Sequence, residues 1–252
     1  MTAKLRHPEI LRLAQTHGKV TVEGLAEDLG VTLQTIRRDL SDLAASGQLE
    51  RVHGGAVLPS GTENIAYEER RQLNEAAKSR IGLACAARIP NDISLFLSIG
   101  TTAEAVARAL SEHRGLMVVT NNSNIASILA PHPDAQVIVT GGVLRHSDGG
   151  LTGPIAQSTL AQFRFDMAVL GCSAIDGRGT LLDFDMDEVR ALQTVLETSQ
   201  TTCLVADASK FARHAPVAIA GLSTLDRIVT DAPLETSLSL ACASAGTQTI
   251  VA

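Results

Sequence analysis

A segment near the N-terminus places side chains that can read DNA bases on one side of a predicted helix. Its apolar positions recur at helical spacing and comprise Leu33, Ile36, Leu40 and Leu43. If these face inward, the polar residues between them point outward, and they include Gln34, Thr35, Arg37, Arg38 and Ser41. Arginine pairs bidentately with guanine, and glutamine with adenine, in a groove that admits one helix. Two adjacent arginines alone would more often mark a solvated helix face, so the interpretation depends on the elements around them.

Three short helices and a hairpin are predicted around this segment. The expected helix starts are Pro8 at a first helical position and the N-cap residues Thr21 and Thr32, and the glycines expected to end the helices are Gly18, Gly30 and Gly47. The short connection Gly30-Val31 is typical of a helix-turn-helix. Residues 48–58 are predicted as two strands around His53-Gly54-Gly55, a wing-like hairpin. The candidate DNA-contacting residues are Thr32, Gln34, Thr35, Arg37, Arg38, Ser41, Arg51 and His53.

The second half of the chain carries small polar residues where its predicted strands end. Short apolar segments alternate there with helical stretches, which predicts βα units and a mainly parallel sheet. The predicted strands are residues 93–97, 116–119, 137–139, 167–170, 203–206, 228–229 and 249–251. Five of them are followed by the turns Ser98-Ile99-Gly100-Thr101-Thr102, Thr120-Asn121-Asn122-Ser123, Thr140-Gly141-Gly142, Gly171-Cys172-Ser173 and Asp207-Ala208-Ser209-Lys210.

In a parallel α/β sheet such turns converge at the ligand crevice. Glycine and threonine expose N–H groups and hydroxyls before a helix N-terminus, which suits a phosphate, although loops favour these residues anyway. Several such turns, with Arg145 and Lys210 as available cations, favour a small phosphorylated ligand; a surface salt bridge is the alternative for the lysine. The candidate effector-binding residues are Gly100, Thr101, Thr102, Thr120, Asn121, Asn122, Gly141, Gly142, Arg145, Asp207 and Lys210.

Length and composition limit the classes of protein that fit. The 252 residues are 45% hydrophobic and 19% charged, which suits one or two domains with a buried core and excludes disorder, collagen and coiled coil. Residues 1–56 carry balanced charge, so the net charge of −6 lies in the remainder and argues against non-specific coating of nucleic acid.

Targeting signals and cysteine spacing indicate the compartment. No apolar run is long enough to span a bilayer, and the charged N-terminus is unlike a signal peptide. The cysteines lie far apart and are Cys85, Cys172, Cys203 and Cys242. They are predicted as buried free thiols, neither a zinc site nor a disulfide frame. We therefore expect a cytoplasmic protein without a membrane partner, a metal or a cofactor.

Two changes of pattern divide the chain. Residues 1–58 are expected to form an α+β winged helix-turn-helix domain. Residues 59–73 are charged and punctuated by proline and glycine, which predicts a linker. Residues 74–252 are expected to form an α/β, Rossmann-like effector domain that opens with a helix reaching about Ile89.

The N-terminal motif is recognisable as a whole. Residues 20–56, VTVEGLAEDLGVTLQTIRRDLSDLAASGQLERVHGGA, resemble the winged helix-turn-helix signature of the DeoR family almost position by position. The resemblance implies a bacterial transcription regulator that binds double-stranded operator DNA. On that pattern the recognition helix covers residues 32–45, with Arg37 and Arg38 inside its TIRRD core.

Residues 68–235 resemble the sensor domain of the same family, which is similar to ribose-5-phosphate isomerase and binds sugar phosphates. The matching segments include LFLSIGTTAEAVARAL at 95–110, VTNNSNIA at 119–126, GGVLRHSDGGLTG at 141–153, GTLLDFDMDEVR at 179–190 and ADASKF at 206–211. The resemblance implies a repressor of a carbohydrate or glycerol catabolic operon that acts as a dimer or tetramer. A phosphorylated polyol or sugar would release it from the operator, with glycerol 3-phosphate favoured.

The chain departs from the family pattern at two places. Ser98 stands where an aspartate usually precedes Gly-Thr-Thr, and Leu192-Gln193 stands where two cations are usual. Both departures bear on the identity of the effector, because the resemblance places cations beside an anion site. The acidic run Asp183, Asp185, Asp187 and Glu188 lacks the loop of an EF-hand and is better explained as a helix N-terminus.

Two other classes of function compete with this interpretation. An isomerase would use Asp176 or Asp207 as a base and Lys210 to stabilise an enediolate, but it has no need of a groove-reading helix. An RNA-binding regulator would need aromatic stacking residues that the first domain lacks. We expect no catalytic residues.

Overall fold

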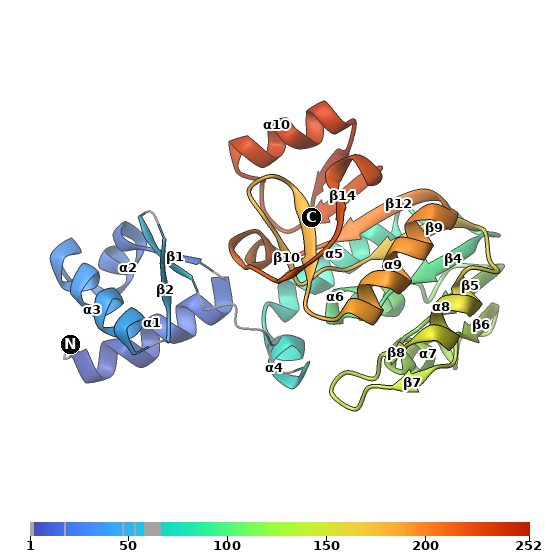
Figure 1. Ribbon diagram of the computed structural model, residues 1–252, viewed down its shortest axis with the longest axis horizontal. Coiled ribbons are helices and arrows are strands. Elements are labelled where there is room, and N and C mark those ends of the chain that lie inside the picture. The colour runs from blue at the N-terminus through green and yellow to red at the C-terminus, as the bar shows by residue number, and fades with distance from the viewer. Residues whose placement is uncertain (1–2, 18, 47, 53, 58–66) are drawn as a thin grey trace.

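Two structural units follow one another along the chain, with a short helix between them (Figure 1). The computed structural model describes residues 3–17, 19–46, 48–52, 54–57 and 67–252. The N-terminal unit contains α1 (Ala3–His17), β1 (Lys19–Thr21), α2 (Val22–Leu29), α3 (Leu33–Ala45), β2 (Glu50–Val52) and β3 (Gly55–Val57). Its strands form an antiparallel sheet in the order β1-β3-β2. The predicted winged helix-turn-helix is therefore confirmed, with β1 as an additional strand.

Local capping signals define α2 and α3 as predicted. Thr21 Oγ1 accepts a hydrogen bond from Gly24 N at 3.0 Å, and Thr32 Oγ1 accepts one from Thr35 N at 3.2 Å. Gly30 follows α2 with φ of 62°, a left-handed conformation that glycine adopts without a side-chain clash. The predictions for Gly18 and Gly47 lie outside the described residues.

Two details of the N-terminal unit differ from the prediction. Pro8 lies inside α1 and not at its first position, so α1 lacks the one hydrogen bond that the Pro8 nitrogen cannot donate. The buried side chains Ile10 and Ala14, beyond the proline, still pack α1 into the core and offset this loss. Leu33 is 42% exposed, so the buried stripe of α3 begins at Ile36, one turn later than predicted.

The C-terminal unit is built on a seven-stranded sheet. Its strands are β4 (Ser94–Leu97), β5 (Leu116–Thr120), β6 (Ala135–Val139), β9 (Phe165–Leu170), β12 (Ser199–Val205), β14 (Arg227–Thr230) and β15 (Gln248–Val251). They lie in the order β15-β14-β12-β9-β4-β5-β6, and each neighbouring pair is parallel. All seven predicted strands are confirmed. The chain reverses its progress across the sheet between the neighbours β4 and β9, so this pair is the topological switch point where ligands bind in such sheets.

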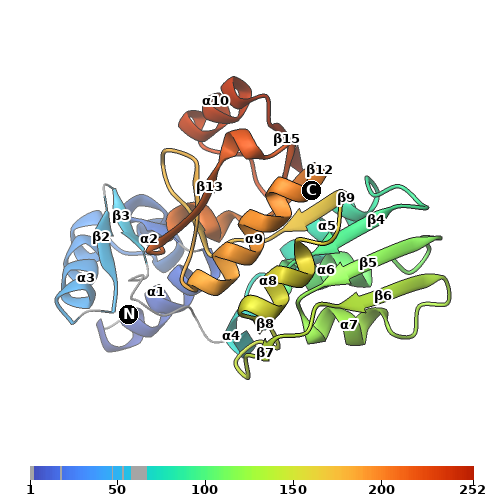
Figure 2. The same cartoon turned by 45° about the vertical axis from the view of Figure 1, so that its right-hand side comes forward.

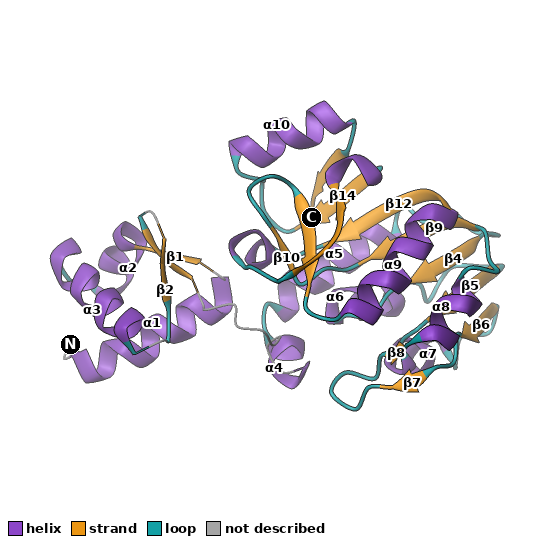
Figure 3. Cartoon of the chain, viewed as in Figure 1, coloured by secondary structure: helices purple, strands orange, loops and turns teal. Residues whose placement is uncertain are grey.

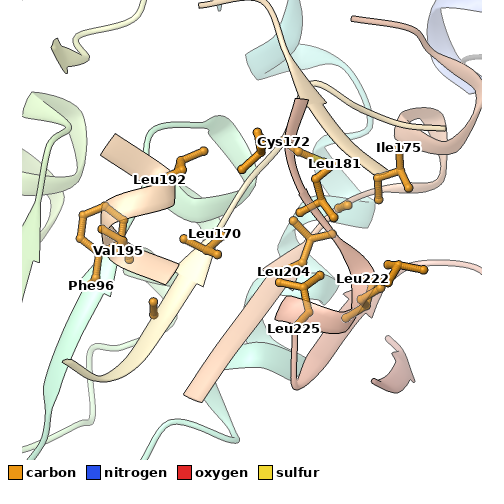
Figure 4. Packing of buried hydrophobic residues seen from close by; sticks show 14 of the residues in the cluster. Phe96, Leu170, Cys172, Ile175, Leu181, Leu192, Val195, Leu204, Leu222 and Leu225 are labelled. Atoms are coloured by element: carbon orange, nitrogen blue, oxygen red, sulfur yellow. The ribbon is translucent and has the colours of Figure 1, made fainter. Parts of the chain in front are cut away.

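Helices cover both faces of this sheet and create two hydrophobic cores (Figure 3). One face is covered by α5 (Glu75–Ala86), α6 (Thr101–Arg108) and α7 (Ser123–Leu129), and the other by α8 (Pro154–Leu160), α9 (Met186–Thr198) and α10 (Thr236–Ala245). Figure 4 shows Leu170 and Leu204 of the sheet in the same cluster as Leu192 and Val195 of α9. The predicted buried core is thus divided between the two faces of the sheet.

Several short elements surround the sheet. They are the hairpin β7 (Val143–Leu144) and β8 (Leu151–Thr152), a small antiparallel sheet of β10 (Ala174–Ile175), β11 (Thr180–Asp183) and β13 (Val217–Gly221), and the 3-10 turns η1 (Ala208–Ala212) and η2 (Leu222–Thr224). Helix α4 (Tyr67–Gln72) forms inside the segment predicted as a linker. The four cysteines are buried free thiols, as predicted. Within the described ranges, no helix is both long and apolar enough to cross a membrane.

Candidate functional site

The outer face of α3 carries the predicted DNA-contacting side chains. Among them, Thr32, Gln34, Arg37, Arg38 and Ser41 are exposed, and Thr35 is half-buried. Arg51 extends from β2 of the wing and is also exposed, whereas His53 lies outside the described residues.

Arg51 fastens the wing to α3. Its Nη1 donates to the Arg37 carbonyl at 3.1 Å and to Ser41 Oγ at 3.3 Å. Ser41 Oγ in turn donates to the Arg37 carbonyl at 2.8 Å. Arg51 and Ser41 therefore set the position of the wing against the helix, while the exposed side chains of Arg37 and Arg38 extend from the same region.

A buried ion pair holds the opposite face of α3. Arg6 of α1 donates from Nε to Asp39 Oδ2 at 2.7 Å and from Nη2 to Oδ1 at 3.1 Å, and His7 Nε2 lies 3.3 Å from Oδ1. Burial opposes the charge on Asp39, but the hydrogen bonds and charge of Arg6 outweigh it and hold the pKa of this carboxyl below its ordinary value. Asp39, inside the TIRRD core, thus positions the helix and leaves base contacts to its neighbours.

A cavity opens at the switch point, where β4 and β9 end. The cavity is small, with a volume of about 40 Å³. It is lined by Arg70, Ile99, Gly100, Thr101, Thr102, Ala103, Asp148, Gly171, Cys172, Ser173, Asp183, Glu188, Val205 and Lys210. Four predicted effector-binding residues, Gly100, Thr101, Thr102 and Lys210, are therefore brought together here.

The N-terminus of α6 forms one wall of the cavity. Gly100 precedes the helix with φ of 135°, a conformation that side chains disfavour, and no side chain caps this end. The first amide bonded within the helix is that of Glu104, which donates to the Gly100 carbonyl at 2.9 Å. The amides of Thr101, Thr102 and Ala103 belong to the first turn, where a helix offers no carbonyl partner to its N–H groups. Together with the helix dipole, these N–H groups favour binding of an anion.

Lys210 brings a positive charge to the same cavity. Burial and then Arg213 lower its pKa to about 8, against the opposing influence of Asp207. The buried Asp207 positions this turn by accepting hydrogen bonds from Ser209 N at 3.1 Å and from Asn74 Nδ2 at 3.0 Å. A bound phosphate would favour the protonated lysine, because opposite charges nearby stabilise the charged form.

The carboxylates Asp148, Asp183 and Glu188 also line the cavity, and Arg145 contacts two of these and Asp185 outside the lining. Its guanidinium donates to Asp148 at 2.8 Å, to Asp185 at 2.7 Å and to Glu188 at 2.6 Å. Burial and then Asp183 raise the pKa of Glu188 to about 8, against the pull of Arg145. Arg145 itself lies outside the cavity lining. Its position suits a role in orienting these carboxylates better than direct contact with an anion.

The acidic run begins a helix, as predicted. Asp185 caps α9 and accepts from Asp187 N at 2.8 Å and from Glu188 N at 3.1 Å. Among the residues that the structure describes, no group of three or more His, Cys, Asp or Glu side chains is arranged to hold a metal ion.

The other predicted effector-binding residues lie outside the cavity lining, and they are Thr120, Asn121, Asn122, Gly141, Gly142, Arg145 and Asp207. Thr120 Oγ1 donates to the Leu97 carbonyl at 2.8 Å, and Asn122 Oδ1 caps α7 by accepting from Asn124 N at 2.8 Å. A Cβ on Gly142 would lie 2.6 Å from the Thr152 carbonyl oxygen, so glycine is needed for close chain approach. These residues shape the loops around the cavity.

The two departures from the family pattern have different structural settings. Ser98 Oγ accepts from Gly171 N at 2.8 Å and so joins the ends of β4 and β9 beside the cavity. Leu192 is buried in the core, and Gln193 donates to the Ile219 carbonyl at 3.0 Å. Neither Leu192 nor Gln193 is among the residues that line the cavity.

Sequence reasoning missed several lining residues, above all Arg70, Asp148, Asp183 and Glu188. Asp183 and Glu188 belong to the acidic run, which the sequence analysis explained only as a helix N-terminus. Arg70 belongs to the six-residue helix α4, which is too short to show an apolar period. Its only sequence signal is a charge cluster, EERR, in a segment otherwise typical of a linker.

Fold and sites together define a helix-turn-helix protein joined to a small-molecule-binding domain. The DeoR-like helix-turn-helix domain matches residues 6–62, and the DeoR C terminal sensor domain matches residues 73–232. The chain therefore belongs to the DeoR family.

Named relatives share most of the chain's length. The glycerol-3-phosphate regulon repressor of Escherichia coli (strain K12) is 44% identical over 228 residues, which cover 90% of each chain. That of Haemophilus influenzae is 44% identical over 91% of this chain and 90% of its own. The HTH-type transcriptional repressor CsqR of E. coli is 37% identical over 92% and 88%.

Solved structures resemble the chain over a smaller part. Ribose 5-phosphate isomerase from Methanocaldococcus jannaschii has a TM-score of 0.41 at 13% identity and covers 55% of each chain. eIF2B beta from Chaetomium thermophilum has a TM-score of 0.45 at 15% identity and covers 61% of this chain and 48% of its own.

Proposed function

We propose that this protein is a DNA-binding transcriptional repressor that a small phosphorylated polyol or sugar, glycerol 3-phosphate in first place, releases from its operator. One observation carries the proposal: the cavity at the switch point sets an uncapped helix N-terminus and Lys210 in one lining. The same chain also exposes the predicted recognition helix, so one molecule can bind both the ligand and DNA. The relatives named as glycerol-3-phosphate regulon repressors support the choice of effector.

The two kinds of lining group suit the two ends of a polyol phosphate. The α6 amides, the hydroxyls of Thr101 and Thr102, and Lys210 can donate to a phosphate. Asp183 and Glu188 carry oxygens that can accept from hydroxyl groups. A polyol without phosphate would leave the cationic side of the cavity without its partner and should bind much more weakly.

On the DNA side, we propose that α3 enters the major groove while the wing lies beside it. Helix-turn-helix proteins commonly bind as dimers to two half-sites about one helical turn apart. We therefore expect the chain to act as a dimer or tetramer on a palindromic operator, with partners limited to itself, double-stranded DNA and the effector.

An isomerase activity finds less support in the site. Asp176 accepts from Arg178 N at 2.9 Å and Thr180 N at 2.8 Å within a tight turn and lies outside the cavity lining, as does Asp207. Neither proposed base therefore stands beside a ligand in the cavity. We expect no turnover of ribose 5-phosphate.

A thermal-shift screen tests the effector assignment. Sugar and polyol phosphates are added to the full chain beside their dephosphorylated counterparts. Because a ligand that binds the native state raises its stability, glycerol 3-phosphate should raise the melting temperature in a saturable way, whereas glycerol should not. Equal shifts by both compounds, or turnover of any phosphate, would overturn the assignment.

A further inference from the structure

Helix α4 connects the two sites, because it carries one of the cavity's arginines. It is the first described element after the helix-turn-helix unit, from which residues 58–66 separate it. The loop that joins β7 and β8 reaches toward α4 in Figure 1 and Figure 2, and Arg70 contacts Asp148 of this loop. Arg70, near the end of this helix, lines the effector cavity.

The Arg70 side chain is held by a carboxylate of the cavity. Its Nη2 lies 3.2 Å from Asp148 Oδ2, and the two side chains are only 13% and 6% exposed. Asp148 already has the guanidinium of Arg145 as a closer partner, at 2.8 Å from two nitrogens. The contact of Arg70 with Asp148 is thus longer than those of Arg145, and losing it would leave Asp148 paired with Arg145.

The backbone of the same residue is tied to the cavity wall. The Arg70 carbonyl accepts hydrogen bonds from Thr101 Oγ1 at 3.4 Å and from Lys78 Nζ. Thr101 begins α6 and lines the cavity, so its hydroxyl can either hold α4 or donate to a bound phosphate. An anion in the cavity would therefore compete with Asp148 for the Arg70 guanidinium and with the Arg70 carbonyl for the Thr101 hydroxyl.

A separate contact holds the other end of α4. Tyr67 Oη donates to Glu104 Oε1 at 2.9 Å and accepts from Asn124 Nδ2 at 3.0 Å. These groups lie on α6 and α7 and do not line the effector cavity. The helix can therefore stay attached at Tyr67 while its Arg70 end changes partner.

We propose that Arg70 is both a phosphate-binding residue and the coupling element of the switch: effector binding transfers its guanidinium from Asp148 to the phosphate and shifts α4, the segment that leads to the DNA-binding unit. The inference rests on the proposed function, since it requires a phosphorylated effector in this cavity. Guanidinium binds phosphate bidentately, and coupling of two sites requires an element that each ligand state holds differently.

The experiment measures effector binding and operator binding separately on the full chain. Glycerol 3-phosphate binding is followed by calorimetry. Operator affinity is followed by fluorescence anisotropy with a duplex selected from a random library by the wild-type protein. Wild type is compared with Arg70→Gln and with the matched control Arg71→Gln, which changes an exposed arginine on the same helix outside the effector cavity.

For Arg70→Gln we expect an operator Kd without effector between the effector-free and effector-saturated values of wild type, because its contact with Asp148 is lost. Measurable operator binding also shows that the variant folds. Its Kd for glycerol 3-phosphate should rise at least about tenfold, as the loss of a charge-assisted hydrogen bond requires. At saturating effector, its operator Kd should change less than about twofold, where wild type and Arg71→Gln change about tenfold or more. Should Arg70→Gln not fold, Arg70→Lys keeps the charge and should give weakened binding and partial release.

Two results would overturn the inference alone: an Arg70 variant that binds effector as tightly as wild type, or one that binds weakly but releases operator fully at saturation. Failure of the proposed function looks different, because wild type itself would then bind none of the phosphates tested. That result would overturn both.

Discussion

At the residue scale, Lys210 lines the cavity in a buried position that disfavours its positive charge. Burial and Arg213 lower the pKa of Lys210, and an acidic domain offers few other cations to a phosphate. Lys210→Met should raise the effector Kd by roughly ten- to a hundredfold, the effect of a charge-assisted hydrogen bond worth about 1.5–3 kcal/mol. Operator affinity without effector should stay unchanged, so the variant would repress and fail to respond in the cell. Calorimetry and anisotropy check both halves; unchanged effector affinity would exclude Lys210 as a ligand.

Effector binding should also depend on pH with a definite sign. The pKa of Lys210 lies at about 8, so above that pH the free lysine loses its proton and affinity for a phosphate dianion falls. Glu188, whose pKa is also about 8, gains negative charge over the same range and acts in the same direction. Below a pH of about 6 the phosphate dianion takes up a proton and becomes a monoanion, so affinity falls again. Calorimetry from pH 5 to 9.5 should therefore show tightest binding near neutrality. In Lys210→Met the alkaline fall should shrink; an alkaline fall of wild-type size would contradict the assignment.

The arginines of the recognition helix should affect DNA binding alone. Arg37→Ala or Arg38→Ala should weaken operator binding by about 1–3 kcal/mol for a base contact. A phosphate contact would instead weaken binding to every sequence alike and reduce its salt dependence. Arg80→Ala, an exposed arginine of α5, is the matched control. Anisotropy at two salt concentrations separates the cases, and wild-type affinity in both variants would rule out α3 as the recognition helix.

At the scale of elements, α3 depends on a buried ion pair that fixes its orientation. Asp39→Asn removes the negative charge that the buried Arg6 contacts, so the melting temperature and the operator affinity should both fall. Asp42→Asn changes an exposed carboxylate on the same helix and should alter neither. The pKa of Asp39 is held below its ordinary value, so its contribution to stability is present above about pH 4 and is lost as the pH falls further. Thermal melts of the two variants at neutral pH check this expectation. Equal melting temperatures would contradict it.

The same scale shows what sequence patterns can and cannot predict. All seven strands of the parallel sheet were predicted, because each is a short apolar run bounded by turn residues. The strands β7, β8 and β10 have two residues each, and no periodicity can mark so short a strand. The turns after β4, β9 and β12 contribute residues to one cavity, because strand order brings these strand ends together. Arg70 and Asp148 could not be found in this way, because tertiary contacts alone bring them to the cavity.

At the scale of the whole molecule, a single winged helix is a small contact surface. Single DNA-binding modules bury less protein surface than dimers and bind correspondingly more weakly. A fragment ending near residue 58 should bind the selected operator far more weakly than the full chain, and the full chain should sediment as a dimer or tetramer. Sedimentation velocity and anisotropy test this together. A strictly monomeric full chain with undiminished operator affinity would contradict the proposed assembly.

The central claim is that a phosphorylated effector in the switch-point cavity controls the affinity of α3 for DNA. Its most direct test is the operator affinity of the full wild-type chain, measured by anisotropy with no addition, with saturating glycerol 3-phosphate and with the same concentration of glycerol. Coupling of the size usual between two such sites predicts that glycerol 3-phosphate raises the operator Kd by about 5- to 150-fold while glycerol leaves it unchanged. An operator Kd that is the same in all three conditions, although calorimetry shows the phosphate bound, would contradict the account.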